Sequence, residues 1–130
     1  MKVVAIVQAR MGSIRFPAKV MQPICGKPMI GLLLKRLAKS KRVEQIVLAT
    51  SEDSCNEELE NYVFGLGFTV FRGSEDDVLD RYYRTAMEVN ADVIVRVTGD
   101  CPLIDTSLVD AVIENLVKKS VCYASNISPP

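Results

Sequence analysis

Short runs of apolar, mostly β-branched residues recur along the chain and predict the strands of a buried sheet. They lie at Val3–Val7, Ile46–Ala49, Thr69–Phe71 and Val93–Val97. The runs are nearly continuous rather than alternating, which is typical of parallel strands that are covered on both faces. We therefore expect a parallel sheet buried on both sides.

The segments that follow these runs repeat apolar residues at the spacing of one helix face. The four sets are Ile30, Leu33, Leu34 and Leu37; Leu59, Tyr62, Val63 and Leu66; Val78, Tyr82, Ala86 and Val89; and Leu108, Val109, Val112, Ile113 and Leu116. In the third set we expect Leu79 to join the core as well. Because strands and helices alternate, the pattern favours an α/β fold, a three-layer sandwich with right-handed crossovers.

Residues with strong capping preferences mark the ends of these helices. Starts are indicated by Pro28, by a capping box at Ser54/Glu57, by a weaker one at Ser74/Asp77, and by Asp105; an end is indicated by Gly65 and Gly67. We interpret Gly26-Lys27-Pro28 as a turn into the first helix.

Length and composition bound the class of protein. A chain of 130 residues, 48% of them hydrophobic, is expected to bury one core as a single domain. Its first apolar run is too short to span a bilayer and no cleavage site follows it, so we expect a cytoplasmic protein without a membrane partner. The four cysteines form no C-x-x-C pair, and the absence of histidine excludes Ser-His-Asp catalysis. Any metal must then be held mainly by oxygen, which favours magnesium or manganese.

Charge is distributed unevenly, although the net charge is zero. Residues 1–43 contain ten Lys or Arg and no acid, whereas the rest contains all sixteen acids and six bases. This asymmetry indicates an anionic ligand near the N-terminal third. Nucleic acid is the less favoured ligand because only one aromatic residue, Phe16, lies among these bases.

A basic loop from Gln8 to Lys19 leaves the first predicted strand. Gly12 allows close approach of the backbone to a ligand, with Ser13 beside it. Arg10, Arg15 and Lys19 would neutralise a triphosphate. The alternative is an ordinary solvated loop, since the segment matches neither a Walker A loop nor G-x-G-x-x-G.

Asp100 follows the last predicted strand in the segment Val97-Thr-Gly-Asp-Cys-Pro-Leu103. Ligands of open α/β sheets collect at this edge, especially where the strand order reverses. If the first and fourth strands are neighbours there, Asp100 faces the basic loop, and a bridging magnesium would relieve its repulsion of a triphosphate. An Asp that only caps a Gly-Asp turn is the alternative.

The segment Arg72-Gly-Ser-Glu-Asp-Asp-Val-Leu79 leaves the third strand at the same edge. Its location alone suggests contact with the base or ribose of a nucleotide, and the competing interpretation is strong. The alternative is a helix N-terminus without a ligand, for which Ser74 and the acids are well suited. We interpret Glu52 and Asp53 as solvated charges at a helix start.

Four ordered motifs carry a resemblance to a known family: Gln8-Ala-Arg-Met-Gly-Ser-x-Arg-x-Pro-x-Lys19, Gly26-Lys-Pro-Met29, Arg72-Gly-Ser-x-Asp-Asp-Val-Leu79 and Gly99-Asp-Cys-Pro-Leu103. Together they resemble the spore coat polysaccharide biosynthesis protein F group of the cytidylyltransferase family. That group is related to acylneuraminate and 3-deoxy-manno-octulosonate cytidylyltransferases. The resemblance covers nearly all of the chain, although Ala18 departs from the usual Pro-Gly-Lys.

The resemblance implies a Rossmann-like, mostly parallel sheet of the nucleotide-diphospho-sugar transferase type. It also implies transfer of CMP from CTP to a sugar or sugar acid in polysaccharide or surface glycan biosynthesis, with magnesium. The residues that fall on its nucleotide site are Arg10, Gly12, Ser13, Arg15, Lys19, Arg72, Ser74 and Asp77, with Arg10 and Lys19 in the catalytic role and Asp100 as the metal ligand.

Members of that family continue beyond a Ser-Asn-x-x-Pro-Pro segment into a second half, which carries acceptor contacts, another metal carboxylate and a homodimer surface. We therefore expect residues 1–130 to be the nucleotide-binding N-terminal half of such a domain, truncated at its C-terminus. A non-catalytic nucleotide-binding fragment is one alternative. A glycosyltransferase that uses a nucleotide sugar is another, although no D-x-D pair lies at a predicted strand end.

Overall fold

The main sheet is built from the segments in which apolar runs predict strands. The computed structural model describes residues 1–9, 11, 21–24, 26–99 and 103–124. Its strands are β1 Val3–Gln8, β4 Gln45–Ser51, β5 Thr69–Gly73 and β6 Val93–Thr98; its helices are α1 Met29–Leu37, α2 Glu57–Gly65, α3 Val78–Glu88 and α4 Thr106–Lys118, with a 3-10 turn, η2, at Ser54–Asn56. The predicted order of strands and helices is confirmed.

The sheet is parallel throughout, in the order β5-β4-β1-β6. From β1 the chain moves outward through β4 to β5, then returns through α3 to the other side of β1. Strand β1 is therefore paired on both sides, with β4 and with β6. The direction of strand addition reverses at the β1–β6 boundary.

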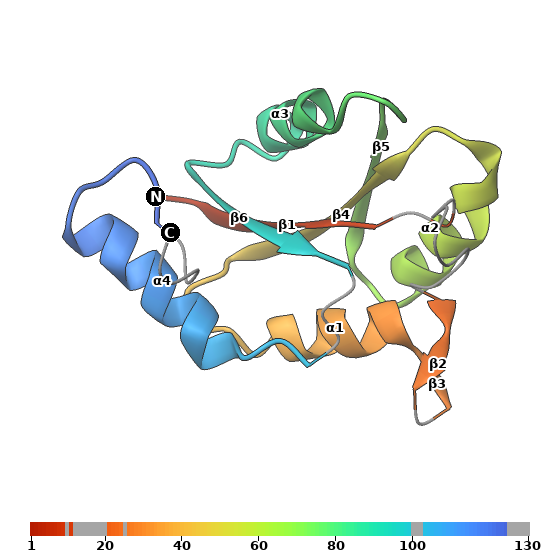
Figure 1. Cartoon of the computed structure of the whole chain (residues 1–130), viewed down its shortest axis with the longest axis horizontal. Helices are drawn as coiled ribbons and strands as arrows, with labels where there is room; N and C mark the ends of the chain where they lie inside the picture. Colours follow the sequence, from red (N-terminus) through yellow and green to blue (C-terminus); the bar gives the residue numbers. More distant parts are fainter. Residues whose placement is uncertain (10, 12–20, 25, 100–102, 125–130) are drawn as a thin grey trace.

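Helices cover both faces of the sheet, which gives the predicted three layers (Figure 1). Alternate residues of β1 explain the division. Ala5 and Val7 pack with α1 and α2 in one apolar cluster, whereas Val4 and Ile6 pack with α3 in another. The fold is thus a three-layer α/β sandwich with a Rossmann-like parallel sheet.

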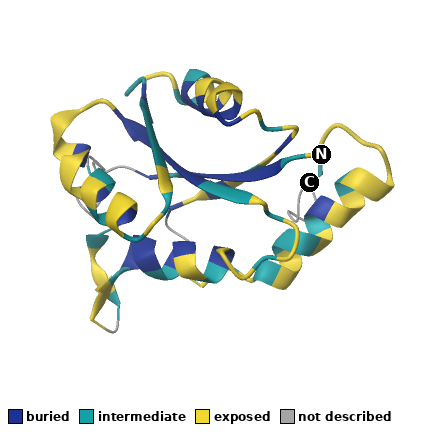
Figure 2. Ribbon diagram, turned by 180° about the vertical axis from the view of Figure 1, so that it is seen from behind, coloured by how far each residue is buried: buried dark blue, intermediate teal, exposed yellow. Residues whose placement is uncertain are grey.

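Burial on both faces holds for the inner strands but not for β6. Ile94, Arg96 and Thr98 of β6 are exposed, and the outer surfaces of α3 and α4 are exposed as well (Figure 2). The prediction fails here because one helix, α3, cannot cover the whole of its face of the sheet. Leu79 was also expected in the core, but 79% of it is exposed, since it lies on the outer side of the first turn of α3.

Local chemistry sets the ends of the elements, with some departures from expectation. A short antiparallel hairpin, β2 Pro23–Ile24 and β3 Lys27–Pro28, precedes α1, so Gly26-Lys27-Pro28 is part of a hairpin rather than a simple turn. Gly26 has φ +80° there, a conformation that favours glycine. The expected capping box of Ser54 is wrong, because Asp53 caps η2 through the amide of Cys55. Within the described residues, no helix has the length and apolarity needed to cross a membrane.

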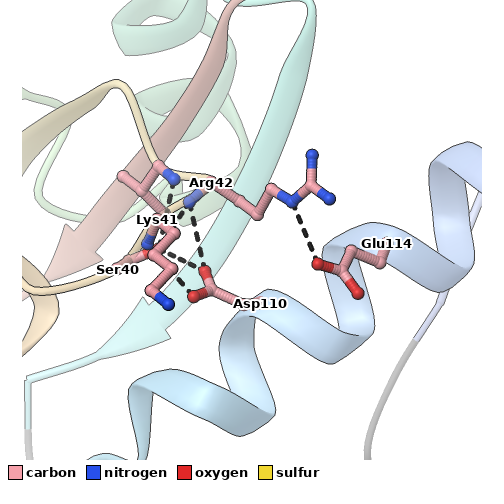
Figure 3. Close-up of polar contacts among 6 residues, drawn as sticks. Ser40, Lys41, Arg42, Asp110 and Glu114 are labelled. Atoms are coloured by element: carbon pink, nitrogen blue, oxygen red, sulfur yellow. Dashed lines mark hydrogen bonds and ion pairs between the residues drawn. The ribbon is translucent and has the colours of Figure 1, made fainter.

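Helix α4 is attached to the loop between α1 and β4 through Asp110 (Figure 3). The carboxylate accepts hydrogen bonds from the Ser40 hydroxyl and from the backbone N–H groups of Lys41 and Arg42, the latter two at 3.1 and 3.3 Å. One turn later Glu114 pairs with the Arg42 Nε at 3.0 Å. These contacts lie at the amino edge of the sheet, away from the predicted nucleotide site.

Candidate functional site

The carboxyl ends of the parallel strands share one edge, and the predicted site residues follow those ends. The basic loop follows β1, residues 52–56 follow β4, the Arg72–Leu79 segment continues from β5, and Asp100 follows β6. Because α/β sheets bind ligands at this edge where strand order reverses, the β1–β6 boundary is the expected position of the site.

Gly99 allows the ends of β1 and β6 to meet closely. Its backbone N–H donates to the carbonyl oxygen of Gln8 at 2.8 Å. A Cβ atom at this position would lie 2.7 Å from the Ala9 Cβ and 2.9 Å from the Gln8 oxygen, closer than such atoms pack. The first and fourth predicted strands are neighbours, so the condition for Asp100 to face the basic loop is met, and the segments that lead to Arg10 and Asp100 begin side by side.

Six of the predicted site residues lie outside the described part of the chain, and their roles stay predictions. They are Arg10, Gly12, Ser13, Arg15, Lys19 and Asp100. The described residues Gln8, Ala9 and Met11 place the loop that carries the first five at the carboxyl end of β1.

Arg72, a predicted nucleotide contact, holds the loop after β4. Its Nε donates to the carbonyl oxygen of Ser51 at 3.0 Å and one terminal nitrogen donates to that of Asp53 at 2.7 Å. The other terminal nitrogen lies 3.6 Å from a Glu60 carboxylate oxygen. A guanidinium has five N–H donors, so these contacts leave donors for a phosphate.

Asp77 caps the N-terminus of α3, so the expected capping box with Ser74 as the cap is wrong. The Ser74 hydroxyl accepts a hydrogen bond from the Asp77 N–H at 3.1 Å, and the Asp77 carboxylate accepts one from the Asp80 N–H at 2.9 Å. These bonds match the helix-start interpretation of the segment, and contact with a nucleotide stays a prediction. Together with Arg72, Ser74 borders a hollow of about 400 Å³ at the carboxyl end of β5.

Asp53 and Cys55 form a small polar unit beside this loop. The N–H and the thiol of Cys55 both donate hydrogen bonds to the Asp53 carboxylate, and both bonds lower the pKa of Asp53. The hydrogen bond from the thiol also raises the pKa of Cys55. The raised pKa keeps the thiol protonated near neutral pH. The interpretation of Asp53 as a helix-start charge is confirmed.

The sequence patterns did not single out Asn56, which is fully buried beside the basic loop. Its Oδ1 accepts the Met11 N–H at 2.8 Å, and its Nδ2 donates to the Ser51 hydroxyl at 2.6 Å. The sequence carries no signal for this role, because Asn56 lies next to a helix start, where Asn is common for capping alone.

On the opposite face, Gln8 contacts a second polar cluster. The Tyr82 hydroxyl, on α3, donates to the Gln8 Oε1 at 3.3 Å, and the Arg96 guanidinium lies 5.5 Å from the centre of the Tyr82 ring. Burial raises the pKa of Tyr82 despite this cation, so the hydroxyl stays protonated and can donate.

Comparison with known proteins decides the family. The sequence profile of the family described as cytidylyltransferase matches residues 4–129. The chain belongs to the cytidylyltransferase family. The family resemblance of the four motifs is thereby confirmed, over nearly the whole length of the chain.

Cytidylyltransferase relatives are similar in both sequence and structure. The spore coat polysaccharide biosynthesis protein SpsF of Bacillus subtilis is 40% identical over 129 residues, which are 96% of this chain and 54% of that protein. A cytidylyltransferase structure from Leptospira borgpetersenii superposes with a TM-score of 0.87 and 41% identity over 91% of this chain and 50% of that one.

A structure of CMP:2-keto-3-deoxy-manno-octonic acid synthetase complexed with CTP gives a TM-score of 0.83 and 27% identity. The match covers 93% of this chain and 49% of that one. The chain therefore spans about half the length of the cytidylyltransferases that it matches.

Proposed function

We propose that the protein is the nucleotide-binding part of an enzyme that transfers CMP from CTP to a sugar or sugar acid. The observation that supports the proposal is the close contact of β1 and β6 at Gly99, because the basic loop follows one of these strands in the sequence and Asp100 follows the other. At this edge the basic loop would supply cations for a triphosphate, and Asp100 would supply a carboxylate for a metal.

In the proposed reaction a hydroxyl oxygen of the acceptor attacks the α-phosphorus of CTP. A new phosphorus–oxygen bond forms, the bond to the β-phosphate bridge breaks, pyrophosphate leaves and the hydroxyl proton passes to solvent. Arg10 and Lys19 would neutralise charge that develops on the phosphate oxygens, and Arg15, with the backbone around Gly12 and Ser13, would hold the triphosphate. Arg72, Ser74 and Asp77 would border the nucleotide at the end of β5.

Magnesium fits the donor chemistry of this chain. The sequence has no histidine, and in the described residues no three Cys, Asp or Glu side chains gather as a metal cluster. Magnesium is commonly held by one or two carboxylates together with substrate phosphates, and the predicted carboxylate of Asp100 would suit such a site. When bound, the ion would offset negative charge on the phosphate oxygens.

Calorimetry with CTP, UTP, ATP and GTP in the presence of magnesium tests the proposal. We expect CTP to bind, and Lys19→Glu to lower its affinity more than tenfold because a cation becomes an anion beside the triphosphate. Lys39→Glu is the matched control, since Lys39 is exposed between α1 and β4 at the opposite edge. Unchanged CTP affinity in Lys19→Glu would refute the assignment of Lys19.

A non-catalytic nucleotide-binding protein is the second candidate, because every site residue predicted in this chain is assigned to the nucleotide or to its metal. Both candidates bind CTP, so the discriminating measurement is release of pyrophosphate from CTP with a panel of sugar acids. Release above the rate without acceptor supports the transferase, whereas binding without release supports the second candidate.

A further inference from the structure

The side chain of Asn56 does not cap the helix that begins after it. Asn56 is the N-cap of α2, yet its side chain makes no capping hydrogen bond, although capping is the usual reason for Asn at this position. The side chain is fully buried. Its hydrogen-bonding capacity is directed away from its own helix, toward the basic loop and toward β4.

The two bonds of Asn56 fix the orientation of its amide group. A backbone N–H can only donate, so the atom that faces Met11 must be the carbonyl oxygen, and the bond is 2.8 Å long. The amide nitrogen then faces the Ser51 hydroxyl at 2.6 Å. The Met11 nitrogen belongs to the peptide group that joins Arg10 to Met11. Asn56 therefore fixes the backbone of the basic loop directly beside one of its predicted phosphate-binding cations.

The backbone segments around Asn56 are themselves joined by hydrogen bonds. Ser51 ends β4 and is fully buried. Its carbonyl oxygen accepts from Arg72 of β5, which also bonds to the carbonyl oxygen of Asp53. The ends of β4 and β5 thus form a rigid support from which the Asn56 side chain reaches the loop after β1.

We propose that Asn56 is a positioning residue for the basic loop, which sets the backbone at Arg10–Met11 so that the loop cations meet a triphosphate. The proposal rests on the proposed function, because it assumes that this loop binds the nucleotide. Asn56 acts through the Met11 backbone and needs no contact with the substrate. Arg72 supports the same backbone indirectly, through Ser51.

The test compares Asn56→Ala with Ser51→Ala. Both variants remove the same Asn56–Ser51 bond, but only Asn56→Ala also removes the bond to Met11. We expect Asn56→Ala to lower CTP affinity about tenfold or more and to speed hydrogen exchange of the Met11 amide, followed by NMR of protein labelled with 15N-methionine. Ser51→Ala should change CTP affinity less than about threefold and leave the Met11 amide protected.

The outcomes separate this inference from the function on which it rests. No CTP binding by the wild-type chain would overturn the proposed function, and this inference with it. Normal CTP affinity in an Asn56→Ala variant whose Met11 amide exchanges freely would overturn the inference alone. Should Asn56→Ala fail to fold, the wild-type protein remains decisive, because a Met11 amide that exchanges at the rate of an open loop would also overturn it.

Discussion

At the scale of single residues, polar side chains at the carboxyl edge have structural partners as well as predicted ligand roles. Asp77 caps α3, Ser74 accepts a hydrogen bond from the Asp77 N–H, and Arg72 holds the loop after β4. Capping and ligand binding are compatible, because a helix N-terminus that is capped by side chains still presents backbone N–H groups at the same edge. Substitution of these residues would therefore change stability and binding together, which makes them poor single tests of the site.

Asp100 offers a cleaner test, because its predicted role depends on a metal. Asp100→Asn keeps the size of the side chain and removes its charge. We expect the variant to lose the magnesium dependence of CTP binding, since a neutral amide is a far weaker magnesium ligand than a carboxylate. The measurement is calorimetric titration of CTP at several magnesium concentrations, with exposed Asp92→Asn at the amino edge as the control. A variant that retains the wild-type magnesium dependence would refute the metal role.

At the scale of elements, a different contact holds the structure together at each edge of the sheet. Gly99 lets β6 approach β1 at the carboxyl edge, whereas Asp110 ties α4 to the 40–42 loop at the amino edge. Burial raises the pKa of the Asp110 carboxyl, but hydrogen bonds from Ser40 and from the Lys41 and Arg42 amides, with the Arg42 charge, outweigh it. The net pKa is lowered in the folded protein.

The lowered pKa of Asp110 predicts how stability depends on pH. A carboxyl with a depressed folded-state pKa stabilises the fold above its unfolded pKa of about 3.9, and this stabilisation is lost as the pH falls below that value through the folded pKa. We expect Asp110→Asn to lower the free energy of unfolding by about 1 kcal/mol at pH 7, allowing for solvent screening. The difference should shrink on acidification from pH 4 to pH 2.

Urea unfolding of both proteins across this pH range is the measurement. Glu114→Gln is the control, because the Arg42–Glu114 pair is about half exposed, with 55% and 52% of the side chains accessible; its effect should stay below about 0.5 kcal/mol. A difference between Asp110→Asn and wild type that is independent of pH would contradict the assignment.

At the scale of the whole molecule, the sequence predicts what depends on local patterns. Continuous apolar runs identified the strands, and helical spacing identified the helices, because each reflects burial of one segment. Exposure of Ile94 could not be read this way, since it depends on how much of the sheet one helix covers. Asn56 was missed because its bond reaches a partner 45 residues away, a pairing that only the fold creates.

Apolar side chains line a hollow beside β6. A hollow of about 700 Å³ lies between β6, α4 and residues 122–124. In the described part of the chain, β6 pairs with β1 alone. A strand at the edge of a sheet that has apolar neighbours is a template for association. Ile94, 46% exposed on this strand, is therefore predicted to promote self-association.

Ile94→Lys places a charge on the β6 edge, which natural sheets use to block edge-to-edge pairing. We expect it to reduce concentration-dependent self-association measured by sedimentation velocity, while stability changes by less than about 1 kcal/mol because the side chain is nearly half exposed. Phe64→Lys is the matched control, since Phe64 is 73% exposed on α2, away from β6. Equal reduction by the two variants would mean that general surface hydrophobicity drives the association, and an edge-specific effect would locate it at β6.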